Sequence, residues 1–143
     1  MSLILDAGPI VALADRRDRM QPQVEALLRA EDGEIVVPAP VTAEVDYLLG
    51  RRLGRPARLA FIDDLASGRF TVACLDAHDH GIVLELERRY DDIDAGLADL
   101  SIVVVAERYR THRVLTFDEQ HFRALRPLGG GNFTLLPADA PPT

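Results

Sequence analysis

The stretch AGLADLSIVVVAERY, residues 95–109, is apolar on almost every side when it is wound into an α-helix. A helix of this kind packs against neighbouring elements on more than one side. We therefore expect this segment to be a helix at the centre of the fold, with the rest of the chain arranged around it.

Short β-rich runs alternate with segments of helical periodicity along the rest of the chain. The runs that predict strands are Leu3–Leu5, Ile35–Val37, Phe70–Leu75, Arg113–Phe117 and Phe133–Leu136. One predicted helix begins near Pro40, a residue suited to a first turn, and it places Val41, Val45, Leu48 and Leu49 on one face. The next helix, residues 58–67, is closed by Gly68 and places Leu59, Ile62, Leu65 and Ala66 on one face. This alternation predicts an α/β fold, a sandwich around a central parallel sheet.

The length of 143 residues fits one domain, and a hydrophobic fraction of 48% is enough for a core. We expect the domain to span residues 1–137, and the proline-rich residues 138–143 to form a flexible C-terminal tail. The three glycines from Gly129 to Gly131 follow no strand-to-helix turn, so a plain loop is expected there.

Nothing in the sequence predicts insertion into a membrane. The apolar opening MSLILDAGPIVALA lacks the basic start and the cleavage pattern of a signal peptide. No apolar run approaches the roughly 20 residues that a bilayer-spanning helix needs. The single cysteine, Cys74, lies in the apolar run FTVACL and is expected to be a small core residue. A chain with one cysteine is expected in the reducing cytoplasm.

The net charge is −7, from 23 acidic and 16 basic residues, and every basic residue is an arginine. A protein of this charge does not bind nucleic acid by neutralising phosphates alone. The objection weakens if several of the acids surround a cation, because a bound metal ion reverses the local electric field.

The positions of four acidic residues are therefore informative. Asp6 follows the first predicted strand and Asp118 follows the fourth, so both are expected at the carboxyl ends of strands. Glu44 and Asp99 lie in the first turns of the helices that begin near Pro40 and Ala95. In open parallel sheets, strand carboxyl ends and helix starts face the same edge, where ligands bind. We refer to these four side chains as the four carboxylates and expect them to converge on one crevice.

Convergence of the four carboxylates has an electrostatic cost. Two carboxylates about 5 Å apart repel by roughly 3 kcal/mol at an effective dielectric constant near 20. The cluster must therefore be protonated in part, neutralised by arginine, or bound to a hard cation. Oxygen ligands without cysteine favour Mg²⁺ or Mn²⁺ over zinc. Such an ion activates water for attack on a phosphodiester, which indicates phosphoryl chemistry.

The segments LILDAGPIVAL (3–13), VTAEVDYLL (41–49), GLADLSIVVVAERY (96–109) and VLTFDEQHF (114–122) resemble, in order and spacing, the four acidic motifs of PIN domains. Each motif is weak alone, but the ordered set is specific and covers nearly the whole chain. The short single-domain length resembles VapC toxins. The resemblance implies a five-stranded parallel sheet, cleavage of RNA with Mg²⁺ or Mn²⁺, a homodimer, and inhibition by a cognate VapB-type antitoxin.

The resemblance also implies roles for individual residues. Asp6 matches the central metal ligand, and Glu44 matches a glutamate that binds metal directly or through water. Asp99 matches the third acid, and Asp118 matches a fourth that ligates more loosely or orients water. Thr116 matches a hydroxyl residue that supports the site by hydrogen bonding. Many relatives carry Ser or Thr directly after the first acid, where this chain has Ala7 and Gly8.

Other interpretations of single residues stay open. Asp99 alone fits a helix-dipole interaction, and Asp94 fits an N-cap of the same helix better than a contact to the metal site. His121 fits a surface or helix-start position better than a role in assisting a leaving group. Three groups of arginines either guide RNA or pair with nearby acids: Arg16, Arg17 and Arg19; Arg51, Arg52, Arg55 and Arg58; Arg108, Arg110 and Arg113.

There are three rival functions. A receiver-type signalling domain needs a lysine in its acidic pocket, and this chain has no lysine. A haloacid-dehalogenase-like phosphatase places a second aspartate two residues after the first, where this chain has Gly8. The stronger alternative is a PIN-like module that binds RNA or protein without cutting.

Overall fold

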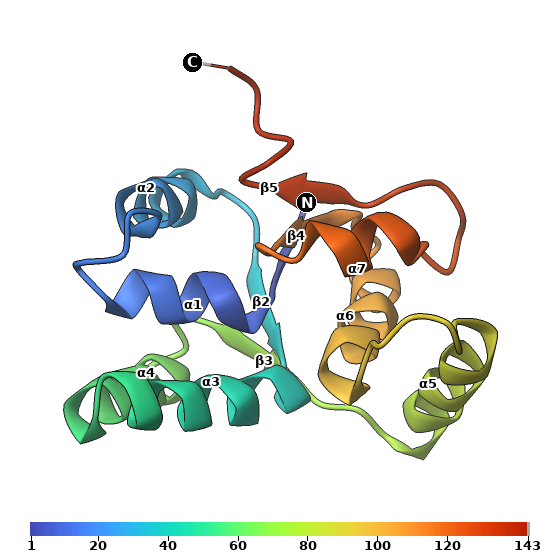
Figure 1. Cartoon of the computed structure of the whole chain (residues 1–143), viewed down its shortest axis with the longest axis horizontal. Helices are drawn as coiled ribbons and strands as arrows, with labels where there is room; N and C mark the ends of the chain where they lie inside the picture. The colour runs from blue at the N-terminus through green and yellow to red at the C-terminus, as the bar shows by residue number, and fades with distance from the viewer. Residues whose placement is uncertain (143) are drawn as a thin grey trace.

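The computed structural model describes residues 1–142. Strands and helices alternate along the chain (Figure 1) in the order β1 (Leu3–Leu5), α1 (Ala7–Ala14), α2 (Gln21–Ala30), β2 (Ile35–Pro38), α3 (Ala39–Arg52), α4 (Arg55–Ala66), β3 (Thr71–Ala73), α5 (Ala77–Arg89), α6 (Leu97–Arg108), β4 (Arg113–Leu115), α7 (Glu119–Ala124) and β5 (Thr134–Leu136). A strand lies at each of the five predicted places, so the predicted α/β architecture is confirmed.

The strands form one parallel sheet in the order β3-β2-β1-β4-β5. The central strand is β1, where Ile4 pairs with Val36 of β2 on one side and with Val114 of β4 on the other. The chain builds the sheet from β1 through β2 to β3, and then returns past β1 to add β4 and β5. The carboxyl ends of β1 and β4 therefore lie side by side where the strand order reverses, which is the usual place for a ligand crevice in such sheets.

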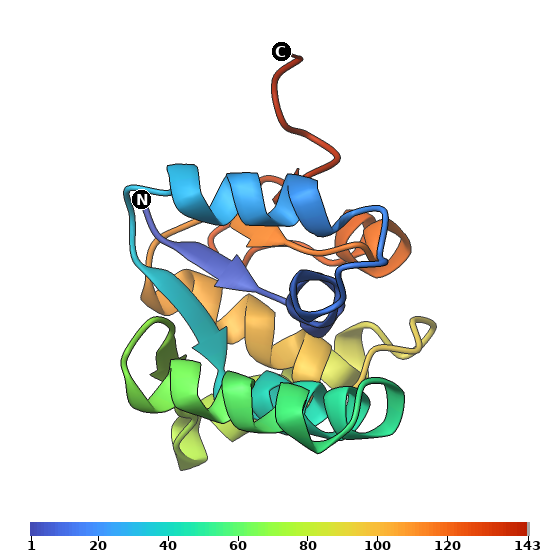
Figure 2. The same cartoon turned by 90° about the vertical axis from the view of Figure 1, so that its left-hand side faces the viewer.

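Helix α6 is the central helix that residues 95–109 predict. Every residue from Leu100 to Ala106 is buried, and the helix contacts β1, β2 and α3. In Figure 2, α6 and α2 lie on opposite sides of β1 and β4, so the sheet is covered on both faces. An all-parallel sheet requires this cover because both of its faces are apolar.

Two predictions about burial are wrong. In α4, Leu59 and Ile62 are 46% and 43% exposed, while Phe61 is buried with its ring 6.4 Å from that of Phe70. The bulkier aromatic pair determines which side of α4 faces the protein. Cys74 is exposed because β3 is an edge strand and ends at Ala73.

The segment after β5 begins with fixed contacts and then extends away from the sheet (Figure 1). The carboxylate of Asp139 accepts hydrogen bonds of 2.8 and 2.7 Å from Arg123 and one of 2.8 Å from the backbone N–H of Leu135. Thr143 lies outside the described residues, and the flexibility of residues 138–143 stays a prediction. None of the helices within residues 1–142 has the length and apolar character needed to cross a membrane.

Candidate metal centre

Asp6 lies between the end of β1 and the start of α1, and its side chain is almost fully buried. It caps α1, since its Oδ1 accepts a hydrogen bond of 2.8 Å from the backbone N–H of Ala7. Its Oδ2 accepts a hydrogen bond of 2.6 Å from the hydroxyl of Thr116. Burial raises the pKa of Asp6 above its ordinary value, although these two hydrogen bonds favour the charged form.

Thr116 connects the ends of the two neighbouring strands β1 and β4. Its hydroxyl donates to Asp6 and accepts a hydrogen bond of 2.9 Å from the backbone N–H of Asp118. Asp118 in turn caps α7, with its Oδ1 accepting a bond of 3.0 Å from the backbone N–H of His121. One hydroxyl thus fixes the relative positions of two acidic residues that are far apart in the sequence.

The four carboxylates meet in one place. Asp6, Glu44, Asp99 and Asp118 line a single open crevice of about 400 Å³, together with Ala7, Gly8, Leu48, Arg52 and Phe117. Asp99 comes from the first turn of α6, and Glu44 comes from the second turn of α3. We call this hollow the acidic crevice. The four carboxylates therefore converge, as expected from their positions at strand ends and helix starts.

The carboxylates of the acidic crevice repel one another. Burial, and then the charge of Asp6, raise the pKa of Asp99 to about 6; nearby His121 acts in the opposite direction, and the charges of Asp118 and Glu44 add to the increase. Burial and the charge of Asp6 also raise the pKa of Glu44. Within residues 1–142, no arginine forms an ion pair with any of the four carboxylates, although Arg52 lines the crevice. The negative charge is therefore concentrated and is not balanced by arginine within the described residues.

His121 is the residue whose place sequence reasoning missed. It lies at the start of α7, as expected, but its side chain turns toward two of the carboxylates and is only 24% exposed. Its Nδ1 lies 2.7 Å from Oδ2 of Asp118 and 3.3 Å from Oδ2 of Asp99. The signal was the spacing of three residues from Asp118, which brings the side chain of a helix's third residue back toward its N-cap.

A buried polar atom at this point lacks a partner. Nδ1 of His121 makes no hydrogen bond within the described residues, although it lies within ion-pairing distance of Asp99 and Asp118. One ligand atom from each of Asp99, Asp118 and His121 lies within 4.8 Å of the others. A ring nitrogen without a hydrogen-bond partner, beside two carboxylate oxygens, is an arrangement that a divalent cation satisfies, and an oxygen-rich donor set suits Mg²⁺ or Mn²⁺. The residues present therefore fit a metal ion.

Asp94 does not cap α6. The N-cap is Gly96 and the helix begins at Leu97, two residues later than predicted. The side chain of Asp94 is exposed, and it does not line the acidic crevice. The N-cap interpretation is wrong because the loop before α6 stays extended through Gly96.

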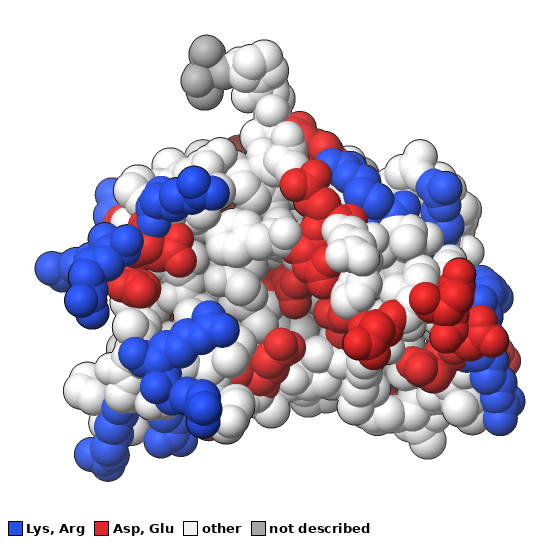
Figure 3. All heavy atoms as spheres, in the orientation of Figure 1, with Lys and Arg blue, Asp and Glu red and all other residues white. Residues whose placement is uncertain are grey.

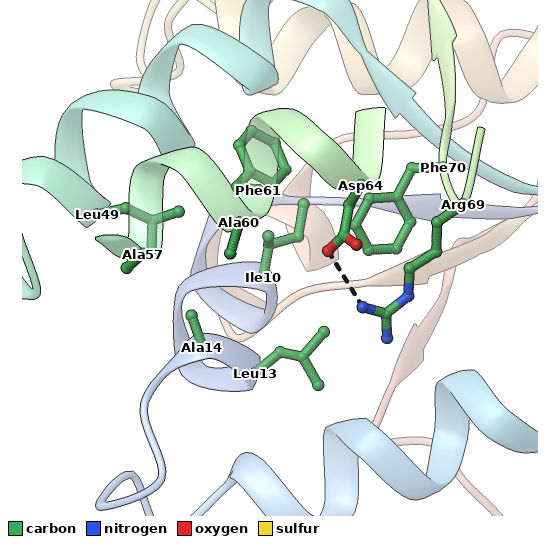
Figure 4. A pocket seen from close by; sticks show the side chains of 10 residues that line it. All are labelled: Ile10, Leu13, Ala14, Leu49, Ala57, Ala60, Phe61, Asp64, Arg69 and Phe70. Carbon is green, nitrogen blue, oxygen red and sulfur yellow. Dashed lines mark hydrogen bonds and ion pairs between the residues drawn. The ribbon is translucent and has the colours of Figure 1, made fainter. Parts of the chain in front are cut away.

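A separate apolar hollow of about 230 Å³ lies between α1, α3 and α4 (Figure 4). Its only carboxylate, Asp64, pairs with Arg69 at 3.1 Å, as the dashed line in Figure 4 marks. This hollow has no uncompensated acid and is not a metal site. On the face shown in Figure 3, acidic side chains run through the middle and arginines gather toward the edges.

Comparisons with known proteins agree with this geometry. The sequence model of the PIN domain matches residues 3–126, a range that contains all four carboxylates. Ribonuclease VapC26 of Mycobacterium tuberculosis (strain ATCC 25618 / H37Rv) is 37% identical over 135 residues, which make up 94% of this chain and 100% of that protein.

Two solved structures share the fold. That of Mycobacterium tuberculosis VapC20, a toxin that cleaves the sarcin–ricin loop, has a TM-score of 0.73 at 20% identity and covers 78% of this chain and 86% of that one. The structure of VapBC2 from Rickettsia felis, bound to a DNA fragment from its promoter, has a TM-score of 0.65 at 19% identity. The match covers 94% of this chain and 97% of that one.

Proposed function

The chain belongs to the PIN domain family, and from this membership we propose that it is a metal-dependent endoribonuclease, the toxin of a VapBC-type toxin–antitoxin pair. One observation supports the proposal most strongly. Four carboxylates from distant segments of the chain line one crevice, and no arginine neutralises them within the described residues. A protein keeps such a cluster at a cost in stability, which is typical of a functional site.

In this proposal Asp6, Glu44, Asp99 and Asp118 hold one or more Mg²⁺ or Mn²⁺ ions, with Nδ1 of His121 as an additional ligand or neighbour. When bound, the ion supplies charge neutralisation at the scissile phosphate and a lowered pKa for attacking water. The all-oxygen core of the ligand set favours these hard cations over zinc.

The protein's own residues supply orientation. Asp6 is held in one position by Thr116 and by the backbone of α1. Asp118 is held by the N-terminus of α7. Glu44 lines the crevice and is exposed, so its carboxylate is accessible to solvent and to a bound substrate. Preorganised ligands of this kind lower the reorganisation needed during the reaction.

We propose RNA as the substrate and a cognate VapB-type antitoxin as the partner, with residues 1–137 as the PIN domain and a homodimer as the assembly. The relative VapC26 is named a ribonuclease, and the VapBC2 structure contains a toxin with its antitoxin. An antitoxin that presents a basic side chain to the acidic crevice would neutralise the same carboxylates that the metal ion needs.

The test is cleavage of RNA by the purified chain, free of antitoxin. We expect products with Mg²⁺ or Mn²⁺, none with chelator, and loss of activity in Asp6→Asn. Since Asp6→Asn preserves the shape of the side chain, its melting temperature serves as the folding control. A wild-type protein that binds RNA but cuts none under any metal condition would favour the non-catalytic module instead.

A further inference from the structure

A second hollow adjoins the acidic crevice, and the side chain of Phe117 lines both. We call it the side groove. Its volume is about 490 Å³, and it is lined by Arg19, Met20, Gln23, Thr116, Phe117, Glu119, Pro137 and Ala138. These residues come from the α1–α2 loop, the start of α2, the β4–α7 junction and the segment after β5. The side groove is therefore an extension of the proposed active site.

Phe117 is an aromatic residue at the junction of the two hollows, and it is 38% exposed. One edge of the ring rests on α1 at Gly8, where an added Cβ would lie only 3.2 Å from Cδ2 of Phe117. Glycine at this position thus permits the close approach of the ring to the helix. The ring is supported on that edge and open to a ligand elsewhere.

The polar side chains of the side groove are available for recognition. Arg19 and Gln23 are exposed, and within residues 1–142 neither forms an ion pair or a side-chain hydrogen bond. The only acid of the groove, Glu119, pairs with Arg123 at 3.2 Å. Arg123 also holds Asp139, which anchors the segment that contributes Pro137 and Ala138 to the groove wall. The groove therefore offers a free guanidinium and a free amide beside an aromatic ring.

We propose that the side groove binds one unstacked base of a single-stranded RNA, next to the phosphodiester that is cut. Phe117 stacks on the base, the amide of Gln23 hydrogen bonds to its edge, and Arg19 contacts the adjoining phosphate. Single-stranded RNA is recognised in this way, by aromatic stacking combined with hydrogen bonds to base edges. An amide carries both donor and acceptor, so Gln23 distinguishes bases by the pattern of their edges.

This inference rests on the proposed function, because it needs an RNA cut at the acidic crevice. It accounts for an arginine without an acidic partner in a protein of net charge −7. It also explains why Phe117, a large apolar side chain, is exposed to solvent at this place.

The test uses the purified full chain with a pool of single-stranded RNAs randomised around the cut, in Mg²⁺, with sequencing of the products. We expect Phe117→Leu to lower kcat/KM by about 5- to 150-fold, chiefly through KM, because the stacking surface is lost. Phe117→Tyr should retain activity because it keeps the ring. Gln23→Leu should change the preferred base at one position beside the cut.

Matched controls separate a local effect from a general one. Tyr47→Leu removes an exposed ring on α3, and Gln120→Leu removes an exposed amide on α7, and neither residue lines the side groove. Both controls should cut the same RNAs as wild type with unchanged kcat/KM. Melting temperatures of all variants show whether the protein still folds.

The failure of this inference is distinguishable from that of the proposed function. If wild type cuts RNA while Phe117→Leu and Gln23→Leu cut the same bonds at the same rate, the base-binding groove is wrong and the nuclease stands. The same holds if Phe117→Leu weakens binding only to a partner protein. If wild type cuts nothing, fluorescence anisotropy with the same labelled RNAs decides: weaker binding by Phe117→Leu than by Tyr47→Leu supports the groove, and equal binding overturns it.

Discussion

Asp99 shows how a single side chain links function to stability. Its raised pKa means that the folded protein binds a proton at this position more tightly than the unfolded chain does. The stabilising effect of that proton is present below the ordinary pKa of 3.8 and is lost as the pH rises toward about 6. At neutral pH, without metal, the ionised side chain therefore destabilises the fold.

We predict that Asp99→Asn raises the free energy of unfolding of the metal-free protein at pH 7 by about 1–3 kcal/mol. The gain over wild type should grow between pH 4 and pH 6 and stay level above that range, because asparagine does not titrate. Thermal denaturation of wild type and Asp99→Asn in chelator across this pH range measures the gain in stability. A gain that is independent of pH would show that ionisation of the buried Asp99 among other carboxylates is not the cause.

Thr116 carries a second prediction, because its hydroxyl serves two groups. Thr116→Val leaves Oδ2 of Asp6 and the backbone N–H of Asp118 without this partner. We expect a loss of about 1–3 kcal/mol of stability and a fall of about 10- to 100-fold in metal affinity or activity. Thr116→Ser keeps the hydroxyl and should retain most of both. Equal behaviour of the two variants would contradict the role given to the hydroxyl.

Some side-chain positions follow from the sequence, and others do not. Asp6 and Asp118 could be placed because each directly follows an apolar run, and the end of a parallel strand has a known position. His121 could not, because its direction depends on where α7 begins and on its capping by Asp118. Asp94 was misplaced for a similar reason, since an extended loop of two more residues precedes α6. Which residue caps a helix is a local detail that periodicity does not determine.

Helices and strands were predicted best where burial is nearly complete. Strands β1 and β2 and residues Leu100–Ala106 of α6 are almost wholly apolar and buried, so their positions follow from composition alone. Helix α4 is different, because it packs on one side only and several of its residues are apolar. The contact between Phe61 and Phe70 determines its orientation, and this contact joins two elements that no local pattern connects.

The pairing of β1 with β2 carries a third prediction, at the turn that precedes β2. A Cβ added at Gly33 would lie 1.9 Å from the backbone oxygen of Met1. That oxygen accepts a hydrogen bond from Arg113, and the N–H of Leu3 donates to the backbone oxygen of Glu34, which holds the two segments together. We expect Gly33→Ala to destabilise the protein by about 1–3 kcal/mol, measured by urea denaturation. Gly81→Ala is the control and should not destabilise the protein, because an added Cβ there meets no atom within 4 Å.

The protein as a whole should become more stable when it binds metal. A ligand that binds only the folded state stabilises it by about 2.7 kcal/mol at a concentration 100 times its dissociation constant. We therefore expect Mg²⁺ or Mn²⁺ to raise the melting temperature by about 5–10 °C under such conditions. Asp6→Asn should abolish most of the increase. An equal increase in wild type and variant would show that the cation binds elsewhere.

The hydrogen bond between Thr116 and Asp6 spans 110 positions of the chain. A ribosome must therefore synthesise the protein beyond β4 before the first and last of the four carboxylates can meet. A nascent chain that is shorter than this has no assembled metal centre. Assembly of the acidic crevice thus waits until β4 and the start of α7 have been synthesised.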